Sequence, residues 1–240
     1  MRLPFLDAER PAFPAPERAL REPNGLLAAG GNLRVATLLD AYRRGIFPWF
    51  EAGQPPLWWS PDPRAVLFPE HIHVSRTMAR LLRRGAYRIT SDRDFAAVVQ
   101  ACAAPRKGAP GTWILTEMIA AYRALHAAGH AHSVECWIDD ELAGGLYGVA
   151  VGRVFCGESM FSIRPNASKL ALIHLARALT AGGFTLIDCQ VGNPHLGSLG
   201  ATAIPRAAFL EHLRDGLGQP PPAWPGAKIS AMVELSPPRN

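Results

Sequence analysis

The spacing of apolar residues predicts helices along most of the first 130 positions. Apolar side chains recur at helical spacing, with Ser, Asp or Thr near the expected starts, in the segments 32–44, 74–84, 91–103 and 116–128. Ser75 lies near the start of the second helix, and Ser91 with Asp94 resembles a capping signal for the third. Strand-like runs at 65–68 and 86–90 separate these helices.

From Ser133 onward the pattern changes to that of strands. Three successive strands are expected over 133–138, 142–151 and 153–161, joined by tight turns at Asp139-Asp140 and Gly152. A helix over 168–181, a buried strand over 184–189 and a last helix beginning at Pro205 follow. Helices, an antiparallel meander, a helix, a strand and a helix make an α+β pattern.

The turn Pro61-Asp62-Pro63 predicts a domain junction, because the residue before each proline is pushed out of helix. We therefore expect a small N-terminal α/β domain over 1–62 and a larger domain over 63–240. By analogy, the element order of the larger domain fits an acetyltransferase-like (GNAT-type) fold, in which a mixed sheet splays to admit an acyl donor. The proline-rich tail after Gly218 is expected to lie along the surface.

Composition indicates a folded protein in a reducing compartment. Of 240 residues, 48% are hydrophobic and 19% charged, which supports a large core and excludes disorder. The net charge of +5 suggests an anionic partner without establishing one. The four cysteines lack the spacing of metal ligands, so no zinc site is expected. We expect no cofactor. An early charge in the N-terminal segment argues against a secretory signal, and no apolar run is long enough to span a bilayer, which predicts a cytoplasmic location without membrane contact.

Two carboxylates stand out because they lie in strand-like runs that are otherwise apolar. Glu158 follows Phe155-Cys156-Gly157, and Asp188 follows Leu186-Ile187 some thirty residues later. A charged group in such a run costs free energy unless it is paired or hydrogen-bonded. Two acids on two apolar strands with a helix between them therefore predict a site, although each could instead be a structural ion pair.

Several longer motifs carry a resemblance to a known family. In chain order they are Glu22-Pro23-Asn24-Gly25-Leu26-Leu27-Ala28-Ala29-Gly30-Gly31, Ala41-Tyr42-Arg43-Arg44-Gly45-Ile46-Phe47-Pro48-Trp49, Trp58-Trp59-Ser60-Pro61-Asp62-Pro63-Arg64, His73-Val74-Ser75-Arg76, Thr112-Trp113-Ile114, His130-Ala131-His132-Ser133-Val134-Glu135, Gly157-Glu158-Ser159-Met160-Phe161-Ser162, Asn166-Ala167-Ser168-Lys169, Ile187-Asp188-Cys189-Gln190 and Ser198-Leu199-Gly200-Ala201. Over nearly its whole length, from about Phe13 to Phe209, the chain resembles the leucyl/phenylalanyl-tRNA–protein transferases.

The resemblance implies an aminoacyltransferase. Such an enzyme moves Leu or Phe, less readily Met, from aminoacyl-tRNA to proteins with an N-terminal Arg or Lys, which marks those proteins for degradation. The implied partners are these two substrates, and we expect a monomer. Two alternatives stay open at this point: an acyl-CoA-dependent N-acetyltransferase and a non-catalytic RNA-binding module. Against the N-acetyltransferase, the sequence contains no Gln/Arg-x-x-Gly-x-Gly/Ala turn that could bind a CoA pyrophosphate. Against the RNA-binding module, phosphate binding would give Glu158 and Asp188 no role.

The tRNA site is expected on one helix and two tryptophans. Four arginines recur at i, i+4, i+7 and i+8 and therefore share one helical face: Arg76, Arg80, Arg83 and Arg84. Such a face suits phosphates, although an ordinary solvated face is the alternative. The resemblance singles out Trp49 and Trp113 to stack on the terminal adenosine.

The aminoacyl pocket is expected between strands and the helix over 168–181. The residues expected to line it are Phe155, Met160, Leu172, Leu175, Leu179 and Ile187. Periodicity alone marks these residues as core, whereas the resemblance implies that part of this core is hollow and accepts the aminoacyl side chain.

The catalytic residues implied are Asp188, Gln190 and Glu158. Asp188 and Gln190 lie two apart on a strand, so their side chains are expected to share a face and form a relay to the incoming α-amine. Glu158 is expected to hold either the acceptor's N-terminal side chain or its α-ammonium. Two departures from the usual family pattern are Asn32, in place of Asp, and Ile163, in place of Arg with Arg164 one position later.

Overall fold

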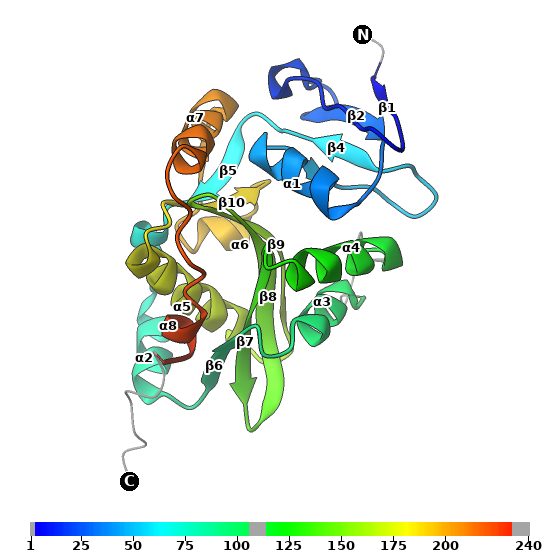
Figure 1. Cartoon of the computed structure of the whole chain (residues 1–240). Coiled ribbons are helices and arrows are strands. Elements are labelled where there is room, and N and C mark those ends of the chain that lie inside the picture. Colours follow the sequence, from blue (N-terminus) through cyan, green and yellow to red (C-terminus); the bar gives the residue numbers. More distant parts are fainter. Residues whose placement is uncertain (1–2, 106–113, 232–240) are drawn as a thin grey trace.

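The structure is a computed structural model, and it describes residues 3–105 and 114–231. It is a mixed α/β structure with two sheets (Figure 1). The smaller sheet has the order β1-β2-β4-β3, with β1 Phe5–Leu6, β2 Leu26–Gly30, β4 Leu57–Trp59 and β3 Phe47–Pro48. Helix α1, Val35–Arg43, follows β2, and a short 3-10 helix, Pro16–Arg18, precedes it.

The larger sheet has the order β11-β5-β10-β9-β8-β7-β6. Its strands are β11 Thr202–Ile204, β5 Arg64–Leu67, β10 Leu186–Gln190, β9 Val154–Ser162, β8 Glu141–Val151, β7 Ala131–Ile138 and β6 Arg88–Ser91. Strands β9 and β10 pair in parallel, and their neighbours pair antiparallel. The meander predicted from the period-two pattern is thus β7-β8-β9.

Helices cover both faces of the larger sheet (Figure 1). One face carries α3, Phe95–Ala103, and α4, Thr116–Ala127. The other carries α5, Ala167–Gly182, with α2, Arg76–Arg84, and α8, Gly226–Ala231. Helices α6, Pro194–Gly197, and α7, Arg206–Leu217, and a second 3-10 helix, Pro69–His71, complete the described elements. None of the described helices is both long enough and apolar enough to cross a membrane.

The starts of α2 and α3 are capped by side chains, as their sequences suggest. Ser75 Oγ accepts the backbone N–H of Met78 at 3.3 Å. For α3 the capping residue is Asp94, whose carboxylate accepts the Ala97 N–H at 2.9 Å, while Ser91 is the last residue of β6. The helix therefore begins three residues later than the sequence pattern indicated.

The predicted junction at Pro61-Pro63 coincides with the passage from the smaller to the larger sheet. One hydrophobic cluster nevertheless extends across it, since Tyr42 and Trp58 belong to the same cluster as Tyr122 and Leu186. The division into domains 1–62 and 63–240 stays a prediction.

The expectation that the C-terminal tail lies along the surface holds for residues 219–221, which are exposed, but is wrong from Trp224 onward. Trp224 stacks on His132 with ring centroids 4.1 Å apart, and its indole N–H donates to Ser91 Oγ at 2.9 Å. Ile229 of α8 is fully buried. Single apolar anchors in a proline-rich segment give no periodic pattern, so the sequence did not reveal this docking.

Candidate active site

The site forms where the two parallel strands of the larger sheet separate. Strands β9 and β10 pair from Val154–Leu186 to Cys156–Asp188, and the pairing stops there although both strands continue. Glu158 lies on β9 and Gln190 on β10, just beyond the last pair. The separation of the strands brings Glu158 and Gln190 to the wall of a cavity that opens between them, whereas Asp188 does not line it.

A β-bulge places Glu158. Tyr147 of β8 is opposite Ser159 and Gly148 is opposite Gly157, so Glu158 is an extra residue without a partner on β8. A bulge re-aims a side chain and sharpens the local twist. Gly148 permits this packing, because a Cβ there would meet Cys156 O at 2.2 Å.

Glu158 is buried in a network of hydroxyl and amide donors. The Tyr122 hydroxyl of α4 donates to its Oε2, and Gln190 Nε2 donates to its Oε1 at 2.9 Å. The Tyr122 hydroxyl also lies 2.8 Å from that of Tyr42 of α1. Burial raises the pKa of Glu158 to about 7, although these hydrogen bonds oppose the rise. The network therefore holds a carboxyl group that changes charge near neutral pH.

Asp188 forms a buried ion pair with Arg64, a partner that the sequence analysis missed. Arg64 Nε and Nη2 donate to the two carboxylate oxygens at 2.8 and 2.7 Å, and both side chains are 1% exposed. Arg64 also lies over the rings of Phe47 and Phe209, with distances to the ring centres of 4.9 and 4.5 Å. The ion pair thereby joins β5, β10, β3 and α7.

The expected side-chain relay from Asp188 to Gln190 is not formed. Asp188 Oδ1 accepts the backbone N–H of Gln190 at 2.9 Å, and the Gln190 side chain contacts Glu158. A second bulge explains the difference, since Asp188 is opposite Val66 and Gln190 is opposite Ala65, which leaves Cys189 as an extra residue. Gln190 has a positive φ of 60°, so the spacing rule for a regular strand does not apply to it.

An open cavity of about 1220 Å³ extends from the separated strands. It exceeds the usual 300–1,000 Å³ of a small-molecule site. Glu158 is the one carboxylate among the described residues that line it. Cys189 also lines it, but burial raises the pKa of its thiol to about 12, so this sulfur is not an activated nucleophile.

Four of the six residues predicted for the aminoacyl pocket line this cavity: Phe155, Met160, Leu172 and Ile187. The prediction needs correction for Leu175 and Leu179, which are fully buried in the core and are absent from the lining. The lining on α5 consists of Ser168 and Leu172, so the cavity follows only the start of the helix. Helical spacing identified the buried face but not where along it the core becomes hollow.

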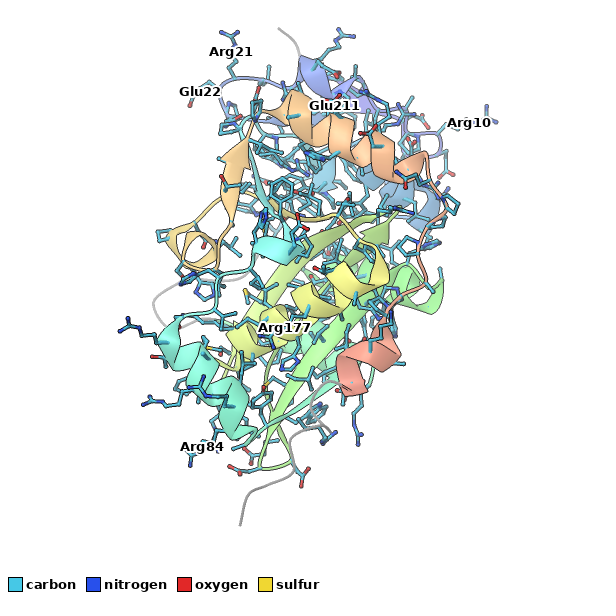
Figure 2. All side chains as sticks on the ribbon, turned by 90° about the vertical axis from the view of Figure 1, so that its left-hand side faces the viewer. Arg10, Arg21, Glu22, Arg84, Arg177 and Glu211 are labelled. Carbon is cyan, nitrogen blue, oxygen red and sulfur yellow. The ribbon has the colours of Figure 1, made fainter. Side chains whose placement is uncertain are left out.

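The predicted tRNA residues lie in different places. Trp49 lines the cavity and is 44% exposed, whereas Trp113 lies outside the described residues. The arginines of α2 are exposed and are not among the described residues that line the cavity: Arg76, Arg80, Arg83 and Arg84. Figure 2 shows Arg84 projecting outward. A basic helix face is present, but tRNA contact remains a prediction.

The two departures from the family pattern have different settings. Asn32 Oδ1 accepts the Arg34 N–H and the Thr37 hydroxyl, which fastens the start of α1. Ile163 is 71% exposed and lines the cavity, while Arg164 lies 3.7 Å from the Glu141 carboxylate. The Arg164 side chain therefore contacts Glu141 and is not among the described residues that line the cavity.

Tyr42, Tyr122 and Arg64 are the site residues that the sequence analysis did not identify. Tyrosines at helical spacing look like ordinary core residues. Arg64 offered one signal, because an arginine at the start of an apolar strand requires an acidic partner if it is buried. No group of three or more His, Cys, Asp or Glu side chains able to hold a metal ion occurs in the part of the chain that the structure describes.

Comparison with known proteins identifies the family. A family model described as leucyl/phenylalanyl-tRNA protein transferase matches residues 66–214, and a model of its N-terminal domain matches 31–62. The leucyl/phenylalanyl-tRNA–protein transferase of Pseudomonas syringae pv. syringae (strain B728a) is 57% identical over 228 residues, which are 95% of this chain and 100% of the relative. The chain belongs to the leucyl/phenylalanyl-tRNA–protein transferase family.

Other members of the family agree. The leucyl/phenylalanyl-tRNA–protein transferase of Chromohalobacter salexigens is 59% identical over 94% of this chain and 89% of its own. That of Nitrosospira multiformis is 56% identical over 89% and 91%. Among solved structures, L-PGS from Bacillus licheniformis matches with a TM-score of 0.38 and 11% identity over 70% of this chain and 53% of its own, which is too distant to bear on fold or function.

Membership of the leucyl/phenylalanyl-tRNA–protein transferase family confirms the resemblance and the prediction of an aminoacyltransferase. It favours this activity over the N-acetyltransferase and the RNA-binding module. The roles of individual residues do not follow from membership.

Proposed function

We propose that this chain transfers Leu or Phe, and less readily Met, from aminoacyl-tRNA to the N-terminal Arg or Lys of acceptor proteins. One observation carries the proposal: a large, mostly apolar cavity has Glu158 as its one carboxylate among the described lining residues. An apolar wall suits the donor side chain, and a lone carboxylate suits a cationic acceptor. The modified proteins would be marked for degradation in the cytoplasm, by a monomeric enzyme.

The separation of β9 from β10 supports an acetyltransferase-type fold for residues 63–240. In such a fold the acyl donor enters between two splayed parallel strands. The cavity begins at the corresponding place here, because its lining includes residues of both strands just beyond the last pair, Cys156–Asp188.

The reaction is aminolysis of an ester. The acceptor's α-amine attacks the carbonyl carbon of the aminoacyl ester, a C–N bond forms and the ester C–O bond breaks. The amine loses a proton, and the ribose oxygen of the tRNA gains one. Aminoacyl esters are already activated, so orientation of the amine contributes more than a strong base.

We assign the orienting contact to Gln190. Its amide nitrogen donates to Glu158, so the planar amide directs its oxygen elsewhere, where it can accept from the incoming amine. Glu158 polarises this amide and attracts the acceptor's positive charge. Asp188 acts indirectly, because it holds the backbone N–H of Gln190 and is itself fixed by Arg64.

Donor selection is expected to discriminate against β-branched side chains. Met160, Leu172 and Ile187 should leave room for branching at Cγ but not at Cβ, so Ile-tRNA is expected to react about 10- to 200-fold more slowly than Leu-tRNA. Single-turnover rates with the two charged tRNAs and one peptide measure this ratio. Equal rates would remove the pocket assignment.

The basic face of α2 is expected to bind tRNA phosphates. Arg80→Glu combined with Arg83→Glu should raise the KM for charged tRNA and reduce the slope of log affinity against log salt by roughly 1 for each lost contact. Arg177→Glu on α5 is a matched exposed control (Figure 2). Unchanged KM and salt dependence would identify the α2 face as merely solvated.

One assay tests the function itself. Purified protein is mixed with labelled Leu-tRNA and peptides that begin with Arg, Lys or Ala. We expect label on the Arg and Lys peptides and little on the Ala peptide. Equal transfer to all three would leave an aminoacyltransferase without the proposed acceptor selectivity, and a lack of transfer would contradict the proposed function.

A further inference from the structure

The C-terminal segment after α7 has no role in the proposed chemistry, although it is fixed to the larger sheet. It lies beyond residue 214, where the match to the family model ends. Helix α8 packs against β6 and α5 (Figure 1). Lys228 Nζ donates to Ala181 O at 3.1 Å, and Trp224 Nε1 donates to Ser91 Oγ at 2.9 Å. The segment is therefore docked in one defined position on the face of the sheet that carries α5.

The indole of Trp224 contacts three rings from other segments. It lies nearly parallel to the His132 ring of β7, with ring centroids 4.1 Å apart and planes at 8°. It also stacks on Phe155 of β9, with centroids 5.5 Å apart and planes at 28°, and it meets the Phe184 ring edge-on at 6.2 Å. Three ring contacts and one hydrogen bond hold the indole in one orientation.

The His132 ring is itself fixed by hydrogen bonds. Its Nδ1 lies 2.8 Å from Asp92 Oδ2, and Asp92 Oδ1 accepts the Ser133 N–H at 2.8 Å. His132 is buried, and it belongs to the motif His130-Ala131-His132-Ser133-Val134-Glu135, which carries the family resemblance without an assigned role. Trp224 therefore stacks on a ring whose plane is set by the sheet.

A glycine on β8 makes room for the Phe155 ring beside this stack. Gly148 is opposite His132 on one side and opposite Gly157 on the other. A Cβ at Gly148 would meet Phe155 Cζ at 2.6 Å, so the ring lies close over the β8 backbone. The Phe155 ring thus contacts the sheet at Gly148 and the C-terminal segment at Trp224.

Phe155 connects the C-terminal segment to the cavity. Its side chain lines the cavity and belongs to the same hydrophobic cluster as Leu172 and Ile187, which line it too. Trp224 packs against this cluster but is not among the described residues that line the cavity. Protein interiors are close-packed, so a change of volume behind a wall residue displaces that residue. The indole therefore supports the cavity wall from behind.

We propose that Trp224 is a positioning residue for donor selection: it holds the Phe155 ring at the wall of the aminoacyl pocket and so limits the size of the side chain that the pocket accepts. This inference rests on the proposed function and deepens it. Trp224 touches neither substrate nor reacting atoms. Its loss should therefore change the relative use of two donors, because the Phe155 ring can then move into the vacated space and enlarge the pocket.

The test measures kcat/KM for Phe-tRNA and for Leu-tRNA with one Arg-initiated peptide. In Trp224→Leu we expect the Phe/Leu ratio to rise about 10-fold over the wild-type ratio, near the lower limit for a difference of one methylene in a pocket. Each variant is compared with the wild type on the same two tRNAs, so differences between the tRNA bodies cancel. A loss of stability alone would lower both rates and leave the ratio unchanged.

A second variant and a matched control complete the experiment. Trp224→Phe keeps a smaller stacked ring, so its ratio should rise only about 2- to 3-fold, and it decides the question if Trp224→Leu does not fold. Trp137→Leu is the control. Trp137 is also half-buried and also donates its indole N–H, to Thr90 Oγ1 at 2.7 Å, but it does not line the cavity. It should keep the wild-type ratio.

The outcomes separate the inference from the proposed function. A wild-type ratio in the folded variants of Trp224, with both donors still used, would overturn the inference and leave the transferase function intact. An equal rise in Trp137→Leu would also overturn it, since the effect would then be a general loosening of the fold. Transfer from neither tRNA by the wild type would contradict both.

Discussion

Asp188→Asn is expected to lower the free energy of unfolding by about 3–5 kcal/mol, because it removes one partner of a buried ion pair. Arg64 is 1% exposed, and its guanidinium would then face an amide with no compensating negative charge. Urea unfolding of the variant at pH 7.5 measures the loss as a lower midpoint with an unchanged slope.

A double-mutant cycle separates the ion pair from a general effect of substitution. Arg64→Met alone should cost a similar amount, because it leaves Asp188 charged and buried. The double variant Arg64→Met/Asp188→Asn should cost clearly less than the sum of the two, since no uncompensated charge remains. Additive losses would contradict a coupled pair.

The single variant Asp188→Asn also tests how Asp188 contributes to the reaction. Its carboxylate accepts the backbone N–H of Gln190 at 2.9 Å, so its loss should disturb the position of Gln190. We expect kcat to fall while KM for charged tRNA changes little, measured at a temperature where the variant is folded. If kcat keeps the wild-type value, Gln190 does not depend on Asp188 for its position.

Glu158→Gln is expected to stabilise the protein at pH 8 while it lowers activity. The pKa of Glu158 is raised from 4.5 to about 7, so the folded chain holds a proton that the unfolded chain has released. This contribution to stability is fully present below about pH 4.5 and is lost as pH rises through about 7. Ionisation at pH 8 therefore costs up to about 3 kcal/mol, which a neutral Gln avoids.

The pH dependence is the measurement for this prediction. The difference in unfolding free energy between Glu158→Gln and the wild type should grow from pH 4.5 to 7.5 and then level off. Transfer to an Arg-initiated peptide should rise with pH through about 7 in the wild type. The variant should lack this rise and should have a higher KM for the peptide, because its side chain carries no charge to attract the acceptor. A pH-independent stability difference would show that Glu158 is not the titrating group.

Much of the architecture could be predicted from local sequence. Ser75 marked the start of α2, and the period of two marked β7, β8 and β9, because caps and alternating burial act over a few residues. The same reasoning located Glu158 and Asp188, since an acid in an apolar strand needs a partner. These features follow from each residue and its near neighbours.

Other features depend on contacts between distant segments. The side-chain partner of Asp188 is 124 positions away, and that of Glu158 on α4 is 36 positions away. The bulges at Glu158 and Cys189 arise from how β8, β9, β10 and β5 pair. No local pattern encodes them, and they decide which way the site residues point.

The sequence by itself therefore determined most elements of the larger sheet and the helices α1 to α5, together with the family and the candidate acids, but not the strands of the smaller sheet. Only the tertiary structure decided that Gln190 contacts Glu158 while Asp188 pairs with Arg64, and that the hollow part of the core ends near Leu172 on α5. The physical reason is that periodicity reports which face of an element is buried, whereas the partner of a buried charge and the position of a cavity depend on how separate elements pack together.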